Sequence, residues 1–476
     1  MRSQPLNIFL GGAFGFLIAY FFSIGWYISL IPTAGVAVCY FLIYFPKHVF
    51  ISLAFFTPIS VNIEEYTEQL GLFLPTEPLL IGLTLLGLAT YLLKHEARSS
   101  FHKEPIAIVL LLYLSWIGVT CITSSHPIIS LKFLLARLWF IIPCFFLSVF
   151  FFSSWRTIRQ FFWWFTLGLV LVITYTIINH AGYQFGEKES HWVMAPFFKD
   201  HTIYGAVVAL ALPFPLVLFY ISKRSALNNM LLILFFTVIS LGLYFSYTRA
   251  AWLSVFGALV IVSLVYFQIK LRWIIILLTV LFAIFLSNKE RIQLEMARNK
   301  VEHTTESFDE RLKSATNVTT DASNLERINR WACAIEMCKE RPVFGFGPGT
   351  FAFEYARFQE PENLTIISTN FGNMGNAHSE FLSALSETGI MGFILFVCFV
   401  AISFYTVINL ITKSKTRNKR IFVTANAILF SLSTYFIHGL LNNFLDTDKA
   451  AYPVFTMIAL SLVLEKKLAP QPNGRV

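Results

Sequence analysis

The sequence is poor in charged residues. Asp, Glu, Lys and Arg make up 13% of its 476 residues, whereas 56% are hydrophobic, so the charged share is about half that of an ordinary soluble domain. This balance excludes a soluble enzyme with one buried core. Apolar runs of about twenty residues recur from end to end, each long enough to cross a bilayer. The sequence therefore predicts an all-α, polytopic membrane protein with about 12 to 14 transmembrane helices.

The sequence also lacks a disulfide framework and a recognisable cleavable leader. Four of the six cysteines lie in apolar runs, namely Cys39, Cys121, Cys144 and Cys398. Cys333 and Cys338 are five residues apart, which places them on different faces of a helix, so we expect free thiols. The first apolar run follows only Arg2 and precedes no small-residue cleavage site, so we expect it to be a retained span.

Basic residues outnumber acidic ones, and their location decides what the excess means. The formal net charge is +9, but most basic residues lie in short links between apolar runs, which does not indicate nucleic-acid binding. These links contain Lys47, then Lys94, Arg98 and Lys103, then Arg156 and Arg159, Lys223 and Arg224, Lys270 and Arg272, the run Lys413–Arg420, and Lys466 and Lys467. The positive-inside rule predicts that these links and both termini are cytoplasmic.

The apolar segments divide the chain into three parts. They lie near residues 7–24, 27–45, 49–61, 78–93, 105–122, 128–152, 160–178, 202–221, 229–246, 250–268, 273–287, 389–411, 421–440 and 449–464. A polar link of 91 residues, 288–378, lies between the eleventh and twelfth of these segments. A loop this long is usually functional or disordered. We expect an N-terminal bundle (1–287), a large outward loop with helices (288–378) and a C-terminal part (379–476).

The second half of the loop carries helix and turn signals. A helix over 325–340 is predicted after Asn324 as its cap, ended by Pro342. The Gly-rich turn 345–349 follows, and a second helix is predicted from Asn376 through His378 to residue 387, before Gly389 bends the chain. The Gly-rich turn does not indicate a nucleotide loop, because it follows a helix where a dinucleotide-binding turn follows a strand.

Three arginines are candidates for binding an anion. Arg249 lies between two spans, where a guanidinium group near hydrocarbon is costly unless an anion or a carboxylate satisfies it. Arg327 and Arg330 precede Trp331 on the predicted loop helix, and guanidinium groups from separate segments could hold a diphosphate without a metal. The alternatives are an interfacial arginine reaching the headgroups and a solvated helix face.

His378 is a candidate base at the membrane surface. An imidazole that titrates near neutrality can accept the proton of an attacking hydroxyl. The alternative is a structural role, since the chain has ten histidines. Glu380, Glu326 and Glu336 are candidate partners that would orient the ring, and the sequence does not choose among them.

Weaker candidates lie elsewhere along the chain. Arg137 is an intramembrane charge and therefore a candidate substrate contact. His201 follows Asp200 at the start of a span and could line the same cavity, although a polar helix start explains this pair equally well. Asp446 and Asp448 have the spacing of a metal–diphosphate motif, but a charged helix start explains them better, and we expect no metal.

Two longer patterns resemble a known family, the O-antigen ligase superfamily. Arg327 with Trp331, followed by residues 341–351 (RPVFGFGPGTF), looks like its central signature, and residues 248–252 (TRAAW) resemble its membrane-edge arginine motif. The family also has a histidine, then Asn, Ser or Gln, nine residues, Gly, two residues and Gly. His378–Gly392 fits this pattern at every position. The similarity is strong over residues 195–395.

The resemblance implies a transferase of the C-type glycosyltransferase class in a bacterial inner membrane, with a periplasmic active face. Such an enzyme moves a glycan from undecaprenyl diphosphate to an acceptor, here lipopolysaccharide core or another glycan, without a cofactor. By the resemblance, Arg249 and Arg327 bind the donor diphosphate and His378 is the base. Chain polymerases and protein O-oligosaccharyltransferases share these motifs. The interpretation from another class is a flippase or transporter for lipid-linked glycans, which needs no base.

Overall fold

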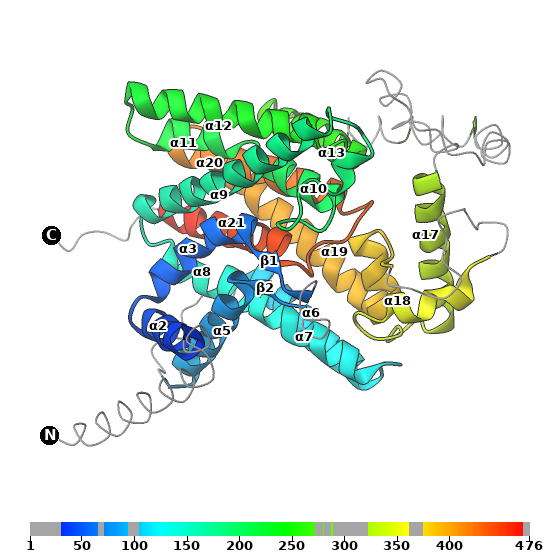
Figure 1. Cartoon of the computed structure of the whole chain (residues 1–476). Helices are drawn as coiled ribbons and strands as arrows, with labels where there is room; N and C mark the ends of the chain where they lie inside the picture. The colour runs from blue at the N-terminus through cyan, green and yellow to red at the C-terminus, as the bar shows by residue number, and fades with distance from the viewer. Residues whose placement is uncertain are drawn as a thin grey trace, which may run out of the picture.

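A computed structural model describes residues 30–64, 71–93, 104–270, 322–360 and 375–469, together with Arg272, Thr279, Ser287 and Asn288. The described chain is helical apart from one small antiparallel pair of strands (Figure 1). The elements are α2 (Leu30–Tyr44), α3 (Pro46–Ile59), β1 (Val61–Asn62), β2 (Phe73–Leu74), α5 (Thr76–Leu93), α6 (Pro105–Ile122), α7 (Pro127–Ile141), η3 (Ile142–Leu147), α8 (Ser148–Phe151), α9 (Trp155–Gly182), η4 (Glu189–His191), α10 (His201–Ala211), α11 (Phe214–Ile221), α12 (Ala226–Tyr244), α13 (Arg249–Tyr266), α17 (Ala322–Glu340), α18 (Phe351–Glu354), η5 (Tyr355–Phe358), α19 (Glu380–Ser414), α20 (Lys419–His438) and α21 (Asp448–Leu468).

The helices confirm an all-α, polytopic membrane protein. In the described residues, eight helices are long and apolar enough to cross a membrane, or nine if a bent pair counts as one span. The bent pair is α2 and α3, which meet at an angle of 119° next to Pro46. The predicted spans at 7–24 and 273–287 lie outside the described residues, apart from the isolated positions Thr279 and Ser287.

The outer helices expose apolar side chains. α12 and α13 carry Leu227, Ile233, Leu253 and Phe256 on exposed surface, where water would penalise them and lipid would not. By contrast, α21 is buried from Asp448 to Leu464 and forms the centre of the bundle. These two patterns are those expected for helices that face lipid and for a helix that faces only protein.

The second half of the long link contains a helix and a turn, and α19 after it contains a bend, largely as predicted. α17 begins at Ala322, so Asn324 lies in its first turn and does not cap it. α19 begins at Glu380 with Ser379 as its cap, so the prediction that a helix runs through His378 is wrong. His378 has a φ of 47°, a left-handed conformation that keeps it out of the helix. α19 bends at Gly389, as predicted.

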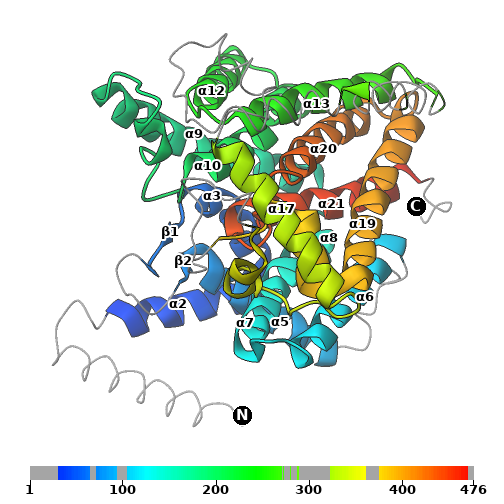
Figure 2. The ribbon, with the colours of Figure 1, turned by 90° about the vertical axis from the view of Figure 1, so that its right-hand side faces the viewer.

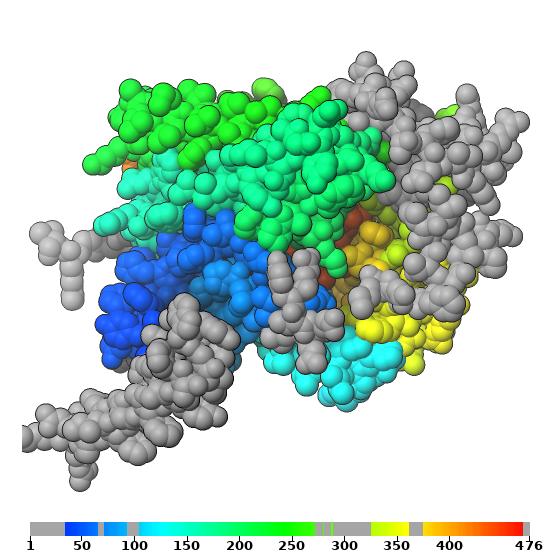
Figure 3. All heavy atoms as spheres, in the orientation of Figure 1, coloured from blue at the N-terminus to red at the C-terminus, as the bar shows by residue number. Residues whose placement is uncertain are grey.

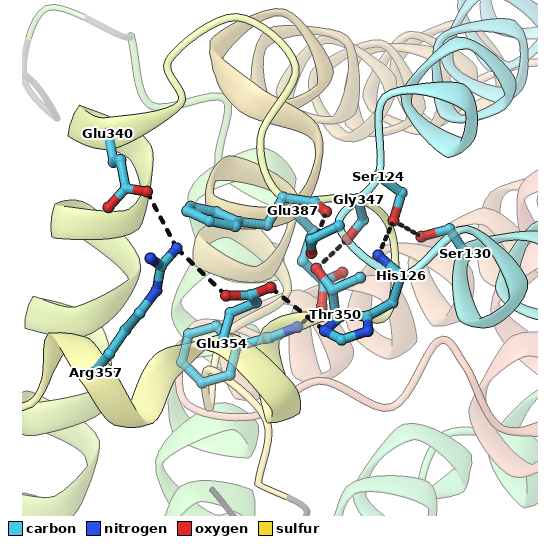
Figure 4. Close-up of polar contacts among 12 residues, drawn as sticks. Ser124, His126, Ser130, Glu340, Gly347, Thr350, Glu354, Arg357 and Glu387 are labelled. Carbon is cyan, nitrogen blue, oxygen red and sulfur yellow. Dashed lines mark hydrogen bonds and ion pairs between the residues drawn. The ribbon is translucent and has the colours of Figure 1, made fainter.

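The Gly-rich turn packs against this bend. Gly389 has a φ of 70°, and a Cβ added there would lie 2.1 Å from the carbonyl oxygen of Val343, so only glycine fits. The backbone N–H of Gly347 donates to the carbonyl of Glu387 at 2.8 Å, and the hydroxyl of Ser130 donates to the carbonyl of Pro348 at 2.8 Å. The turn is thereby fixed between α19 and the start of α7, as Figure 4 shows.

Several helix ends meet beside α17. Figures 1 and 2 both place α10 and α13 toward the upper end of α17, and α6 and α7 toward its lower end. The backbone N–H of Glu380 donates to the carbonyl of Gly439 at 2.9 Å, which joins the start of α19 to the end of α20. In Figure 3, the C-terminal segments show at the bottom of a recess between the green segments and the yellow and cyan ones.

Candidate functional site

The backbone around His378 is held by two hydrogen bonds. Its N–H donates to Oδ1 of Asn376 at 3.0 Å, and its carbonyl accepts from the indole N–H of Trp331 at 3.2 Å. Trp331 belongs to α17, so the helix that carries the loop arginines also fixes the histidine. The left-handed conformation of His378 is maintained by contacts on both sides of the residue.

The imidazole ring of His378 faces an amide group. Its Nδ1 lies 3.4 Å from Oδ1 of Asn442, in the α20–α21 link. If this amide oxygen accepts a hydrogen bond, Nδ1 carries the proton and Nε2 keeps its lone pair. The arrangement therefore suits a ring that accepts a proton at Nε2.

The three carboxylates considered from the sequence have other hydrogen-bond partners. Glu326 pairs with Arg330, and Glu336 pairs with Lys339. Oε1 of Glu380 accepts three hydrogen bonds, from the hydroxyl of Tyr435 and the N–H groups of Phe444 and Leu445. Sequence reasoning missed Asn442, which is 64 positions from His378, because no local pattern reports such a contact.

Arg327 and Arg330 leave α17 in different directions. The Nε of Arg327 donates to the carbonyl of Leu441 at 3.3 Å, next to Asn442. Arg330 is buried: its Nε donates to Glu326 at 2.7 Å, one terminal nitrogen donates to the carbonyl of Asn376 at 3.0 Å, and it lies over the ring of Tyr355. These contacts suit Arg330 for positioning the segment that carries His378.

Arg249 approaches the same region from the membrane helices. It is the first residue of α13, and Tyr247, two residues earlier, has a φ of 50°. The hydroxyl of Thr248 donates to the carbonyl of His201 at 2.7 Å, which joins the starts of α13 and α10. Both Arg249 and Arg327 lie close enough to His201 for electrostatic interaction. Three segments distant in sequence thus contribute to one basic region.

Two further histidines lie in this region. The ring of His191 stacks on that of His201 at 4.1 Å. His438, at the end of α20, is buried, interacts electrostatically with Arg327 and His201, and has no hydrogen-bond partner for either ring nitrogen among the described residues. Asp200 caps α10 by accepting from the N–H groups of the next turn, so the polar helix start is confirmed for that residue. Nothing in the local sequence indicated His191 or His438.

The charges around His378 favour its neutral form. Burial, followed by the positive charges of Arg327 and Arg330, lowers its pKa to about 4. The ring is therefore unprotonated at neutral pH. A bound anion between the arginines would oppose this effect and raise the pKa.

Arg137 lies apart from these arginines. One terminal nitrogen donates to the carbonyl of Leu445 at 2.5 Å, and the guanidinium group lies over the ring of Phe133. It lines a separate cavity of about 170 Å³, together with Asp446. Asp448 instead accepts from the hydroxyl of Ser60 and begins α21, so the charged helix start is confirmed. No group of three His, Cys, Asp or Glu in the described residues could hold a metal ion.

All six cysteines are free, as expected for Cys333 and Cys338. Both lie on α17, and burial raises the pKa of each thiol, to about 12 for Cys333. These thiols are therefore protonated at neutral pH and suit packing better than nucleophilic chemistry. Cys333 belongs to a small apolar core with Phe346 and Tyr355 that joins α17 to the Gly-rich turn.

The fold and the site together define a multi-pass helical membrane protein that gathers arginines and histidines at the ends of its helices. Residues 231–397 match the family model described as O-antigen ligase, and this match supports the O-antigen ligase superfamily. The matched range includes Arg249, Arg327 and His378. No curated protein matches the chain. The matched family implies glycosyltransferase-type activity, with a lipid-linked glycan and a glycan acceptor as partners in general terms.

Proposed function

We propose that the protein transfers a glycan from undecaprenyl diphosphate to a hydroxyl of the lipopolysaccharide core, on the periplasmic side of a bacterial inner membrane. The observation that carries this proposal is the position of His378, which faces Asn442 beside Arg327. Arg249 and Arg327 approach His201 from separate elements, as a clamp for a diphosphate requires. The basic links between spans support cytoplasmic termini and a periplasmic loop.

The proposed reaction is a displacement at the anomeric carbon of the donor. The acceptor oxygen forms a bond to that carbon, and the bond from the carbon to the diphosphate oxygen breaks. Nε2 of His378 takes the hydroxyl proton, and undecaprenyl diphosphate leaves with its negative charge between Arg249 and Arg327. Fixed guanidinium groups stabilise that charge where a divalent ion would otherwise be needed.

A deletion strain distinguishes this function from its alternatives. Loss of a ligase should leave full-length glycan on the lipid carrier and none on the lipopolysaccharide core, measured by gel analysis of both fractions. Single repeat units on the core would instead identify a polymerase, and undecorated glycoproteins a protein O-oligosaccharyltransferase. Donor trapped on the cytoplasmic face would identify a flippase. Unchanged surface glycans and glycoproteins would contradict the whole proposal.

The low pKa of His378 predicts an unusual pH profile. A general base works when it is unprotonated, so kcat/KM should fall only as the pH approaches about 4. The profile of kcat should fall at a higher pH, because the bound diphosphate places negative charge beside the ring and favours its protonated form. Both profiles are measured with purified protein in detergent. A kcat/KM limb at the ordinary histidine pKa of about 6.5 would contradict the described surroundings.

A further inference from the structure

The cavity beside Arg137 lies between α7, the Gly-rich turn, the start of α19 and the α20–α21 link. It has a volume of about 170 Å³, and its polar lining includes Arg137, Glu387, Asp446, Ser383, Asn443 and Asn376. None of these residues belongs to the basic region around Arg249 and His201. Its purpose is therefore not explained by binding of a diphosphate.

Polar atoms in the cavity wall lack partners. Among the described residues, no hydrogen bond satisfies Nε of Arg137, Oγ of Ser383 or Oδ1 of Asn443. Arg137 is only 8% exposed, and leaving a buried donor or acceptor unsatisfied costs about 1–3 kcal/mol. Protein interiors rarely retain such groups without a use. The three atoms themselves have almost no accessible surface, so the polar groups of the wall that a ligand can reach are the half-buried side chains of Asn376 and Asn443 and the exposed carboxylate of Asp446.

The other lining groups narrow the class of ligand. Phe133 is half-buried and adds aromatic surface, on which the C–H face of a sugar ring can pack. The lining has the carboxyl groups of Glu380, Glu387 and Asp446 against the single cation of Arg137. Phosphate or carboxylate groups would meet this excess of carboxylates unfavourably. Hydroxyl groups suit it, because each hydroxyl is both a donor and an acceptor.

The position of the cavity relative to His378 indicates which sugar it holds. Asn376 lines the cavity and bonds to the backbone of His378, and Asn443 follows the residue that orients the ring. In Figures 1 and 2, α10 and α13 lie toward the upper end of α17, and α6 and α7 toward its lower end. The cavity thus adjoins the base on the side away from Arg249. In a direct displacement, the base and the attacking hydroxyl lie opposite the leaving group.

We propose that this cavity is the acceptor subsite and that it binds an uncharged sugar ring of the acceptor. Asn376, Asn443 and Asp446 supply hydrogen bonds to its hydroxyls, and Phe133 supplies an apolar contact. Phosphate groups of the acceptor remain outside the cavity. The assignment to the acceptor rests on the proposed function, whereas the binding of an uncharged sugar rests on the cavity itself.

The test fills the cavity and measures the two substrates separately. Ala352 lines the cavity, and Ala356, one turn later, does not. Ala352→Leu should lower kcat/KM for the acceptor by about tenfold or more, as a pocket that loses volume to an added side chain does, and leave the donor KM unchanged. Ala356→Leu is the matched control and should change neither. Asp446→Asn, which keeps the shape, should also weaken the acceptor alone.

A binding measurement keeps the test independent of turnover. The probe is core oligosaccharide released from lipopolysaccharide by mild acid, with or without chemical removal of its phosphates, and binding is followed by saturation-transfer NMR. Both forms should bind wild type similarly, and Ala352→Leu should weaken both about tenfold. Full binding by Ala352→Leu, a requirement for the phosphates, no binding to wild type, or a raised donor KM would each overturn the acceptor subsite. Binding without transfer by wild type would contradict the proposed function and leave the sugar cavity standing.

Discussion

Replacing His378 with alanine should lower kcat by about a hundredfold to ten-thousandfold, the usual contribution of a general base. Nε2 of the ring is the proposed acceptor for the hydroxyl proton, and Nδ1, on the other side of the ring, faces Oδ1 of Asn442. The donor contacts Arg249 and Arg327 in this mechanism, so donor affinity should change little. The measurement is glycan transfer by purified protein at saturating donor, together with a donor-binding assay.

Two controls separate chemistry from folding in this experiment. His48→Ala removes an exposed histidine on α3, outside the site, and should leave transfer unchanged. Asn442→Leu should reduce kcat with the ring still present, because Nδ1 loses its only oxygen partner among the described residues. Transfer should also persist in the presence of chelator. Full activity of His378→Ala would eliminate this residue as the base, and activity restored only by a divalent metal would point to Asp446.

Replacing Arg327 with alanine should weaken donor binding by about tenfold to a hundredfold and also lower kcat. A hydrogen bond to a charged group is worth about 1.5–3 kcal/mol, and each 1.4 kcal/mol is tenfold in affinity. Turnover suffers as well, since the departing diphosphate gains negative charge that this guanidinium group would stabilise. Binding of a lipid-linked glycan and single-turnover transfer measure the two effects.

The comparison of two arginine variants makes this result specific. Arg327→Lys should recover only part of the affinity, because an ammonium group lacks the planar fork that fits two phosphate oxygens. Arg357→Ala should have no effect on donor binding: Arg357 is exposed and pairs with Glu340 and Glu354, away from His378. Equal losses in the variants at positions 327 and 357 would indicate a general effect of loop charge and would contradict the clamp.

The elements that follow from local pattern were predictable from the sequence. Apolar runs gave the spans, Pro342 ended α17 as predicted, and Gly389 bends α19. These features depend on residues within a few positions of one another. The helix assigned through His378 failed because its polar, helix-compatible neighbours conceal a left-handed residue that Trp331 and Asn376 hold from outside.

The partners of the candidate site were not predictable in the same way. A resemblance in motif singled out Arg249, Arg327 and His378, but it gave no information on Asn442 or His438. Glutamate was the chemically reasonable partner for a histidine, and several were near in sequence. Glu326 and Glu336 pair with Arg330 and Lys339, their neighbours on the same helix. Glu380 instead accepts from the α20–α21 link, which only the folded chain brings close.

The contacts of the Gly-rich turn bear on how relatives of this protein could be recombined. The turn belongs to the long link, but it is held by Ser125 and Ser130 of the α6–α7 region and by the bend of α19. A chimera that exchanged the link alone would place foreign residues against these native contacts. Segments around residues 124–130 and 380–392 would have to travel with it. An exchange of the turn would thus require matched changes in segments more than 200 positions apart.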